Sequence, residues 1–253
     1  MDVGRLEVKI TMDMKNTWKL LNVARKKAFT MIEMLAVILI IAIMAGAATF
    51  YIADTMSALR MTMTGEQLLS IFSSAQQTAS SEGRVVELRF IKYRDATKAG
   101  SQPTFRTVVL LRHYQVGESS PDPAAQGVPL STPLSIVSGD RVDAASGIVL
   151  SEDRTMSSLL AGSALASAGG GAGNVQVKGT DGTFREWVFP QQVTGSVSVF
   201  IRPDGTTNLD PAQQWFVTAL SERSEEASDK STVKNFYCVQ IDPANSRIVS
   251  YRP

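Results

Sequence analysis

The sequence predicts an α+β protein in which a long N-terminal helix packs on an antiparallel β-sheet head. Three observations predict this fold class. Residues 34–53 carry no charged side chain, and residues 54–82 carry apolar side chains at helical spacing. After Gly83 the pattern changes to short runs of β-branched and aromatic residues, separated by Gly- and Pro-containing turns. One long helix followed by a β-rich domain is the simplest arrangement that accommodates all three.

The uncharged segment 34–53 has the length of a membrane-spanning helix. Its twenty residues rise about 1.5 Å each, or roughly 30 Å, which is the thickness of the hydrocarbon core of a bilayer. The basic cluster Arg25, Lys26 and Lys27 precedes this segment, and the positive-inside rule places that end in the cytoplasm. We therefore expect a single-pass protein with the residues after Asp54 on the far side of the membrane.

Glu33 is unusual at the edge of such a segment. A carboxylate in a membrane helix costs about 2.5–3.5 kcal/mol at mid-bilayer and less near the edge, so it tends to have a partner. From Lys26 the sequence reads Lys-Lys-Ala-Phe-Thr-Met-Ile-Glu-Met-Leu. This stretch resembles the N-terminal motif of type IV pilins and type II secretion pseudopilins, in which basic residues, a small residue, Phe, Thr, an apolar pair and Glu precede an apolar helix.

The resemblance implies a processing site. A prepilin peptidase would cut between Ala28 and Phe29, remove residues 1–28 as a leader peptide, and methylate the new amino group of Phe29. Glu33 would then pair with the N-terminus of a neighbouring subunit during assembly. Ala28 stands where the family most often has Gly, and Met12 and Met14 are alternative starts that shorten the leader.

The N-terminal sequence has two other interpretations. Thr30 and Glu33 have the spacing of a capping box, in which each side chain binds a backbone N–H at a helix start; this is compatible with the prepilin motif. A secretory signal also has a basic region followed by an apolar one, but its apolar region is typically about 7–15 residues long. The longer uncharged run of this chain, which continues into an amphipathic helix, favours the prepilin interpretation.

Residues 54–82 complete a spine helix that we place over 29–83. Gly83 is a suitable helix stop. A helix of this length without internal caps fits a membrane-spanning spine better than a globular helix. Its apolar face is expected to contain Leu59, Met63, Leu68, Leu69, Phe72, Ala75, Gln76 and Ala79.

Residues 84–253 are predicted to form the β-rich head. Two strands directly after the helix are expected to pair in antiparallel fashion, and residues 161–174 are expected to be a flexible Gly/Ala/Ser loop. The order of two strands, a variable middle and a strand-Pro-Asp-Gly-strand ending is similar to minor pseudopilins of the H type. The ending on Tyr-Arg-Pro also resembles prepilin-like subunits of the Verru_Chthon cassettes. The strands are expected near 85–91, 104–114, 134–137, 147–150, 184–189, 197–202, 215–220, 236–242 and 247–251.

Composition and motifs give no support for an enzyme or a cofactor. The leader holds seven basic and three acidic residues, a net charge of +4, which leaves −3 for the rest of a chain whose total is +1. A single cysteine, Cys238, excludes an internal disulfide, and a buried, inert thiol is favoured over an intermolecular bridge or a reactive thiol. The single histidine, His113, is expected at a strand end on the surface, with no catalytic role. No metal is expected, although Asp204, Asn208 and Asp210 offer the oxygen ligands of a calcium loop, against which a plain Pro-Asp-Gly turn is favoured.

The sequence therefore predicts a minor prepilin-like subunit in the inner membrane, with a periplasmic head that later enters an envelope fibre. Expected partners are other pilin-like subunits, the prepilin peptidase and the inner-membrane assembly machinery, with no nucleic acid. One alternative is a membrane-tethered binding module that uses the helix only as an anchor. The other is a DNA-uptake pilin, for which the head offers Arg84, Arg89, Arg94, Arg106 and Arg112.

Overall fold

The computed structural model is α+β with a mostly antiparallel sheet, which confirms this part of the predicted fold class but not the transmembrane character of its helix. It describes residues 29–98, 100–161, 166–167, 175–178, 183–186 and 193–253, without the side chains of 47–54, 140, 166–167, 175, 178 and 186. The predicted leader, residues 1–28, lies outside the described residues. The chain divides into two compact units, Met1–Ile52 and Ala53–Pro253. Because this boundary falls within a helix, each half of that helix is described with its own unit.

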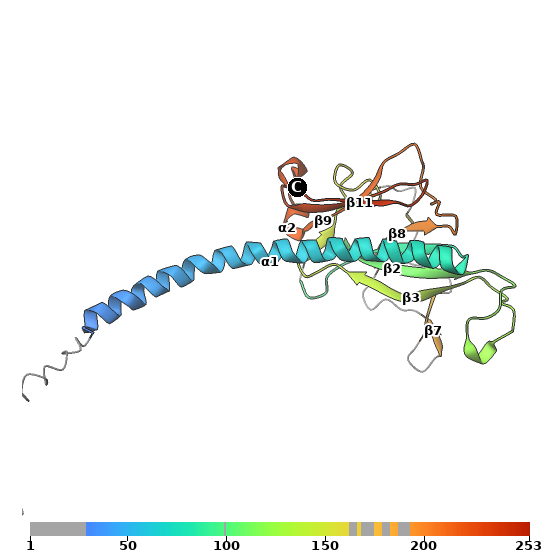
Figure 1. The fold of residues 1–253 in the computed structure, drawn as a ribbon, viewed down its shortest axis with the longest axis horizontal. Helices are drawn as coiled ribbons and strands as arrows, with labels where there is room; N and C mark the ends of the chain where they lie inside the picture. The colour runs from blue at the N-terminus through green and yellow to red at the C-terminus, as the bar shows by residue number, and fades with distance from the viewer. Residues whose placement is uncertain (1–28, 99, 162–165, 168–174, 179–182, 187–192) are drawn as a thin grey trace, which may run out of the picture. The chain divides into compact units, whose positions relative to one another are not determined.

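Helix α1 spans Met31–Glu82, a length of 52 residues (Figure 1). No proline interrupts this range, so no backbone hydrogen bond is lost to one. The helix ends at Gly83, whose φ of 62° is the left-handed conformation that glycine adopts readily at helix C-termini. No helix in the part of the chain that the structure describes is long and apolar enough to cross a membrane.

Residues 53–82 of α1 pack on the sheet through one apolar face. The buried side chains of this face are Met61, Leu68, Ile71, Phe72, Ala75 and Ala79. The ring of Phe72 lies 6.2 Å from that of Phe90 on the first strand. Leu59 and Met63, which were predicted on this face, are instead 53% and 58% exposed. The prediction was wrong by about half a turn at the start of the amphipathic segment, where Met61 is the residue that faces the sheet.

Among the described residues, eleven strands form one sheet, and all but one of the pairings between them are antiparallel. The main path is β11-β10-β9-β4-β2-β1-β8-β5, and β3 branches from β2 to pair with β6, which pairs with β7. The exception is the parallel pair β3–β6. The strands are β1 Val86–Tyr93, β2 Thr104–Tyr114, β3 Leu134–Asp143, β4 Ile148–Leu150, β5 Ala166–Ser167, β6 Val175–Lys178, β7 Phe184–Glu186, β8 Val193–Ile201, β9 Trp215–Ser221, β10 Phe236–Ile241 and β11 Ile248–Tyr251.

The predicted antiparallel pair after the helix is confirmed as β1 and β2. Val86, Leu88 and Phe90 of β1 belong to the core that α1 covers. Side chains alternate along a strand, so Glu87, Arg89 and Ile91 lie on the opposite face. There Ile91 forms a second buried cluster with residues of β2. The sheet therefore has buried side chains on both faces.

Most of the loop predicted over 161–174 lies outside the described residues. Within it, Ala166 and Ser167 form β5 and pair with β8, so the prediction of an uninterrupted loop was wrong at these two residues.

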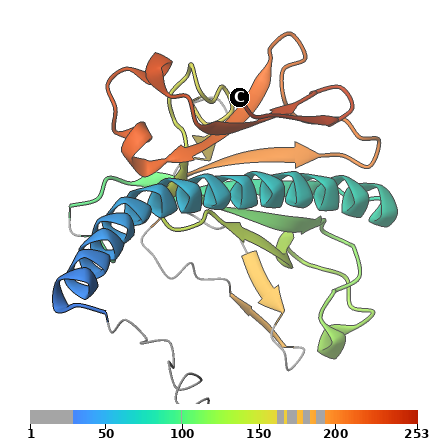
Figure 2. The same ribbon diagram turned by 60° about the vertical axis from the view of Figure 1, so that its left-hand side comes forward.

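The edge strand β11 lies alongside α1 and is attached to it at both ends. The amide Nε2 of Gln76 donates to the backbone oxygen of Ser246, just before β11. The guanidinium of Arg252, just after β11, donates to Thr62 Oγ1. Figure 2 shows α1 crossing the sheet with β9 and β11 on one side and β3 on the other. These two hydrogen bonds connect the ends of β11 to α1.

Candidate processing and assembly site

The start of α1 is fixed by the capping box predicted from the sequence. The backbone N–H of Glu33 donates to Thr30 Oγ1 at 3.2 Å, and the backbone N–H of Thr30 donates to Glu33 Oε2 at 3.4 Å. Two N–H groups that lack a partner within the helix are satisfied in this way. The carboxylate of Glu33 also lies at the positive end of the helix dipole, where a negative charge is favourable.

The residues around the predicted cut are only partly described. Phe29 directly precedes the capping box and is 69% exposed. Ala28 and the basic residues Arg25, Lys26 and Lys27 lie outside the described residues. Glu33 is exposed in the first turn of the helix. The side chains on the C-terminal side of the predicted cut are therefore free for other molecules to contact.

A large apolar surface follows Glu33. Within its own unit, residues 31–46 of α1 expose apolar side chains around the helix, among them Met31, Ile32, Leu35, Ile38, Ile41 and Met44. Monomeric soluble proteins rarely expose apolar patches of more than a few hundred Å². A helix that is apolar on all sides is normally buried among other helices or in lipid.

Of the three candidate calcium ligands, Asp204 and Asp210 accept hydrogen bonds within local turns, and Asn208 accepts one from the backbone of β8. Asp204 accepts from the backbone N–H of Thr206 at 2.9 Å, and Asp210 accepts from that of Ala212 at 2.9 Å. Asn208 Oδ1 accepts from the backbone N–H of Phe200 at 2.8 Å. No group of three His, Cys, Asp or Glu residues in the described part of the chain could hold a metal ion. The turn interpretation accounts for the oxygens of Asp204 and Asp210.

Sequence reasoning missed a buried polar cluster centred on Glu87, on the face of the sheet away from α1. The Glu87 side chain is 1% exposed and binds Arg89 Nε at 2.6 Å, His113 Nε2 at 2.6 Å and Ser198 Oγ at 2.6 Å. His113 Nδ1 lies 3.2 Å from Ser135 Oγ. The β-alternation that placed Glu87 on the second face was the available signal, but it could not show that this face is covered.

The neighbours of Glu87 lower the pKa of its carboxyl group. Burial alone would raise its pKa, but the hydrogen bonds from His113, Arg89 and Ser198 and the charge of Arg89 outweigh burial and lower the pKa to about 2. The order serine–histidine–carboxylate is also found in acyl-transfer triads. Here, however, the Glu87 carboxylate is already held by Arg89 and Ser198, and Ser135 faces His113 as its cross-strand partner. We interpret the cluster as structural. His113, predicted on the surface, is half-buried.

Most of the arginines that a DNA-uptake pilin would use to bind phosphates form ion pairs with carboxylates of the head. Arg84 pairs with Glu118 at 2.6 Å and Arg112 with Glu82 at 3.1 Å. Arg89 pairs with Glu87, as described above, and Arg106 pairs with Glu222. A nucleic-acid interface needs cations that can neutralise phosphates, so these pairs weaken that alternative.

Cys238 is a half-buried free thiol on β10. Burial raises its pKa, which keeps the thiol protonated and less reactive.

Comparison with known proteins supports the N-terminal motif. The family model described as the prokaryotic N-terminal methylation motif matches residues 23–49, a range that contains Ala28, Phe29 and Glu33. No curated protein and no solved structure matches the chain. The chain therefore carries the N-terminal methylation motif of prepilin-like proteins, in agreement with its resemblance to type IV pilins and pseudopilins.

Proposed function

We propose that this protein is a minor prepilin-like subunit that assembles through its N-terminal helix into a type IV pilus or a type II secretion pseudopilus. The match of the methylation motif to residues 23–49 carries this proposal. A prepilin peptidase cuts between Ala28 and Phe29 and methylates the amino group of Phe29. The exposed position of Phe29 next to a capped helix start is consistent with such processing.

The subunit enters the inner membrane before assembly, with its N-terminus in the cytoplasm and its head in the periplasm. The support for this location is the motif, the uncharged segment 34–53 and the preceding Arg25, Lys26 and Lys27. The exposed apolar side chains of residues 31–46 supply the surface for both environments, first lipid and then the helices of neighbouring subunits.

Glu33 fixes how neighbouring helices align. In an apolar environment its charge is costly without a partner, and the methylated ammonium of a neighbouring Phe29 compensates it. The capping box holds the Glu33 carboxylate at the helix start, where a neighbouring N-terminus can approach it. The same contact defines one axial register between two helices.

A minor role in the fibre is favoured by the size of the head. Residues 84–253 amount to 170 of the 253 residues, which is large for a subunit that repeats along a shaft.

The substitution Glu33→Leu tests the assembly role in the cell that makes the protein, and Glu66→Leu is the matched control. Glu66 is exposed on the same helix but lies outside the motif. We expect Glu33→Leu to leave the membrane level unchanged and to reduce incorporation into fibres by roughly tenfold or more, since the register contact is lost. Quantitative immunoblots of membrane and sheared-fibre fractions give both readouts. Equal incorporation of wild type, Glu33→Leu and Glu66→Leu would favour the membrane-tethered binding module instead.

A further inference from the structure

The outward face of α1, away from the sheet, changes its composition along the second compact unit. At the start of this unit the face is apolar, with Met56 45%, Leu59 53% and Met63 58% exposed. Arg60 is exposed among them, and at about 100° per residue the four side chains fall within an arc of about 100°. Further along, the exposed side chains of this face are polar: Glu66, Gln67, Ser70, Ser73 and Gln77. The apolar part is therefore the part next to the uncharged segment 34–53.

Arg60 lies within reach of the headgroup layer of a bilayer whose hydrocarbon core is spanned by residues 34–53. It follows Ala53 by seven residues, or about 10 Å along a helix. The headgroup layer outside the core is roughly 5–7 Å thick on each side. Side chains of a helix point toward its N-terminus, so the long side chain of Arg60 extends back toward this layer.

A second guanidinium lies against α1 at the same level. Arg252, just after β11, donates to Oγ1 of Thr62, which is two positions after Arg60. Arg60 itself donates from Nη1 to the backbone oxygen of Ser146 at 3.5 Å, a long distance for a hydrogen bond. Both arginines are exposed, and a guanidinium has five N–H donors. Each therefore keeps donors for a ligand.

A third guanidinium lies on the short helix α2, Glu222–Glu225. The backbone N–H of Glu222 donates to the oxygen of Gly147 at 2.9 Å. Gly147 directly follows Ser146, the residue that Arg60 contacts, so α2 lies close to the level of Arg60. Arg223 of α2 is exposed, and its guanidinium shows no hydrogen bond to another described residue.

The described carboxylates of α2 do not neutralise these arginines. Glu222 pairs with Lys98 and Arg106. Glu225 pairs with Lys230 at 3.4 Å. Glu226, at the C-terminal cap of α2, is exposed. Among the described side chains, none of the three guanidiniums of Arg60, Arg223 and Arg252 forms an ion pair with a carboxylate.

The composition of this surface indicates which ligand fits. The planar fork of a guanidinium matches two oxygens of a phosphate group and binds them through parallel hydrogen bonds. Such bonds are possible with every phospholipid, whether its headgroup is zwitterionic or anionic. Apolar side chains beside a basic one are typical of helix faces that lie at a membrane interface. A phosphate in the headgroup of a lipid therefore fits better than a free phosphate ion.

We propose that Arg60, together with Arg223 and Arg252, binds phosphates of phospholipids on the head side of the membrane before the subunit enters a fibre. Met56 and Leu59 contact the same lipids beside Arg60. This contact sets the depth at which α1 stands in the bilayer and thus the height of the head above it. The inference rests on the proposed function, because it requires residues 34–53 to span the membrane.

Solid-state NMR tests the contact on the full-length protein with ¹³C-labelled arginine guanidinium groups. The protein is reconstituted into vesicles of phosphatidylcholine and phosphatidylglycerol in a buffer without phosphate, so that lipid is the source of all ³¹P. Dephasing of the guanidinium ¹³C signal by ³¹P reports hydrogen-bonded arginine–phosphate pairs. We expect dephasing in the wild type and the loss of most of it in the triple variant Arg60→Gln, Arg223→Gln, Arg252→Gln. Arg25 of the leader contributes equally to both proteins.

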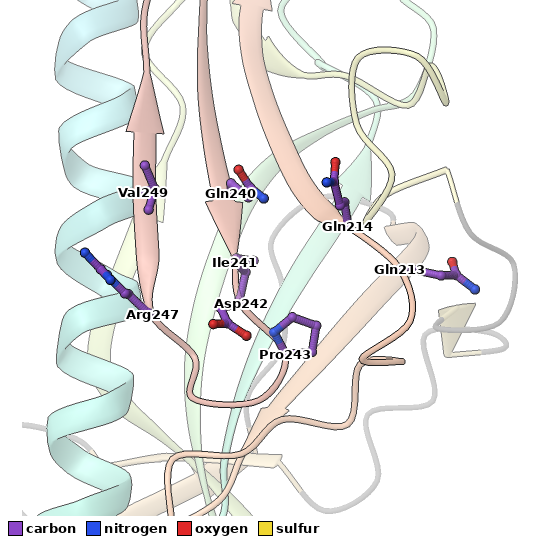
Figure 3. A pocket seen from close by; sticks show the side chains of 8 residues that line it. All are labelled: Gln213, Gln214, Gln240, Ile241, Asp242, Pro243, Arg247 and Val249. Atoms are coloured by element: carbon purple, nitrogen blue, oxygen red, sulfur yellow. The ribbon is translucent and has the colours of Figure 1, made fainter.

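Arg247→Gln is the matched control. Arg247 is an exposed arginine at the start of β11, whereas Arg252 follows its end. Figure 3 shows it beside α1. It directly follows Ser246, whose backbone oxygen accepts from Gln76, and Gln76 lies about 35 Å beyond Ala53 along the helix. We expect no loss of dephasing in Arg247→Gln, and thermal melts verify that the variants are folded.

Three results would overturn the proposal: no dephasing in the wild type, equal dephasing in the folded triple variant, or an equal loss in Arg247→Gln. Flotation of the same vesicles separates this failure from a failure of the proposed function. Protein that floats with the vesicles but shows one of these results removes only the lipid contact. Protein that does not float at all contradicts the membrane stage of the proposed function as well.

Discussion

Glu87 is the residue in the described part of the head whose charge is most strongly tied to folding. Its carboxylate is almost fully buried, and Arg89, His113 and Ser198 all bind it. Replacement of both partners of a buried ion pair by apolar residues often changes the stability of a protein little. Removal of one partner alone is strongly destabilising, because it leaves the other charge buried and uncompensated. Protonation of the Glu87 carboxylate should therefore change the free energy of unfolding as the pH is lowered.

An unperturbed glutamate side chain has a pKa of 4.5, whereas the pKa of Glu87 in the folded protein is lowered to about 2 by its hydrogen bonds and the charge of Arg89. Since the folded value is the lower one, its contribution to the free energy of unfolding is complete above pH 4.5 and is lost as the pH falls toward 2. The substitution Glu87→Gln should lower the free energy of unfolding by roughly 3 kcal/mol at neutral pH and flatten its decrease in this acid range. Urea unfolding at a series of pH values measures both effects.

The control for this prediction is Glu226→Gln, which changes an exposed glutamate. It should shift the free energy of unfolding by no more than about 0.5 kcal/mol. The structural interpretation of the cluster would be wrong if Glu87→Gln matched this control at every pH.

The capping box and the polar cluster differ in how far sequence could predict them. Thr30 and Glu33 interact across three positions of one helix, so their spacing alone indicated the contact. Glu87, His113, Ser135 and Ser198 come from four strands, β1, β2, β3 and β8. Their meeting depends on strand order and register, which a single sequence does not reveal.

At the scale of the elements, the packed half of α1 depends on a close approach at Gly65. A Cβ atom added there would lie 2.3 Å from two ring atoms of Tyr237 on β10. Any side chain at this position would push the ring and the helix apart. Gly65 thus sets the distance between α1 and the β9–β11 part of the sheet.

We predict that Gly65→Ala destabilises the head by roughly 1–3 kcal/mol, the usual cost of overpacking a core. Gly46→Ala is the control, since nothing lies within 4 Å of an added Cβ at that position of the same helix. Thermal unfolding in detergent, followed by circular dichroism, compares the two variants. A Gly65→Ala protein as stable as Gly46→Ala would show that the ring of Tyr237 moves aside without cost.

Elements with local signals were predicted well, and those that depend on distant pairing were not. The helical spacing of apolar residues and the β-branched and aromatic run over 104–114 predicted α1 and β2 to within a few residues. The strand predicted at 134–137 is the first part of a longer β3, Leu134–Asp143, in which Gly139 has φ 89°. The pairing of β3 with β6 is parallel and joins segments about 40 positions apart, and no local pattern specifies such a partner.

At the scale of the whole molecule, the specific evidence for function is concentrated at one end of the chain. The methylation motif covers residues 23–49, whereas the sheet is built from residues 86–251. The motif indicates how the subunit is processed and attached to others.

Mass spectrometry of the N-terminus of the protein isolated from its native membrane tests the central claim most directly. The account predicts a chain that begins at N-methylated Phe29, with residues 1–28 removed. Omission of the prepilin peptidase from the same cells should leave the leader attached, as a control. An intact leader in normal cells, or cleavage within 45–48 as by a secretory signal peptidase, would contradict the account, because Phe29 would then not become the charged terminus that Glu33 requires.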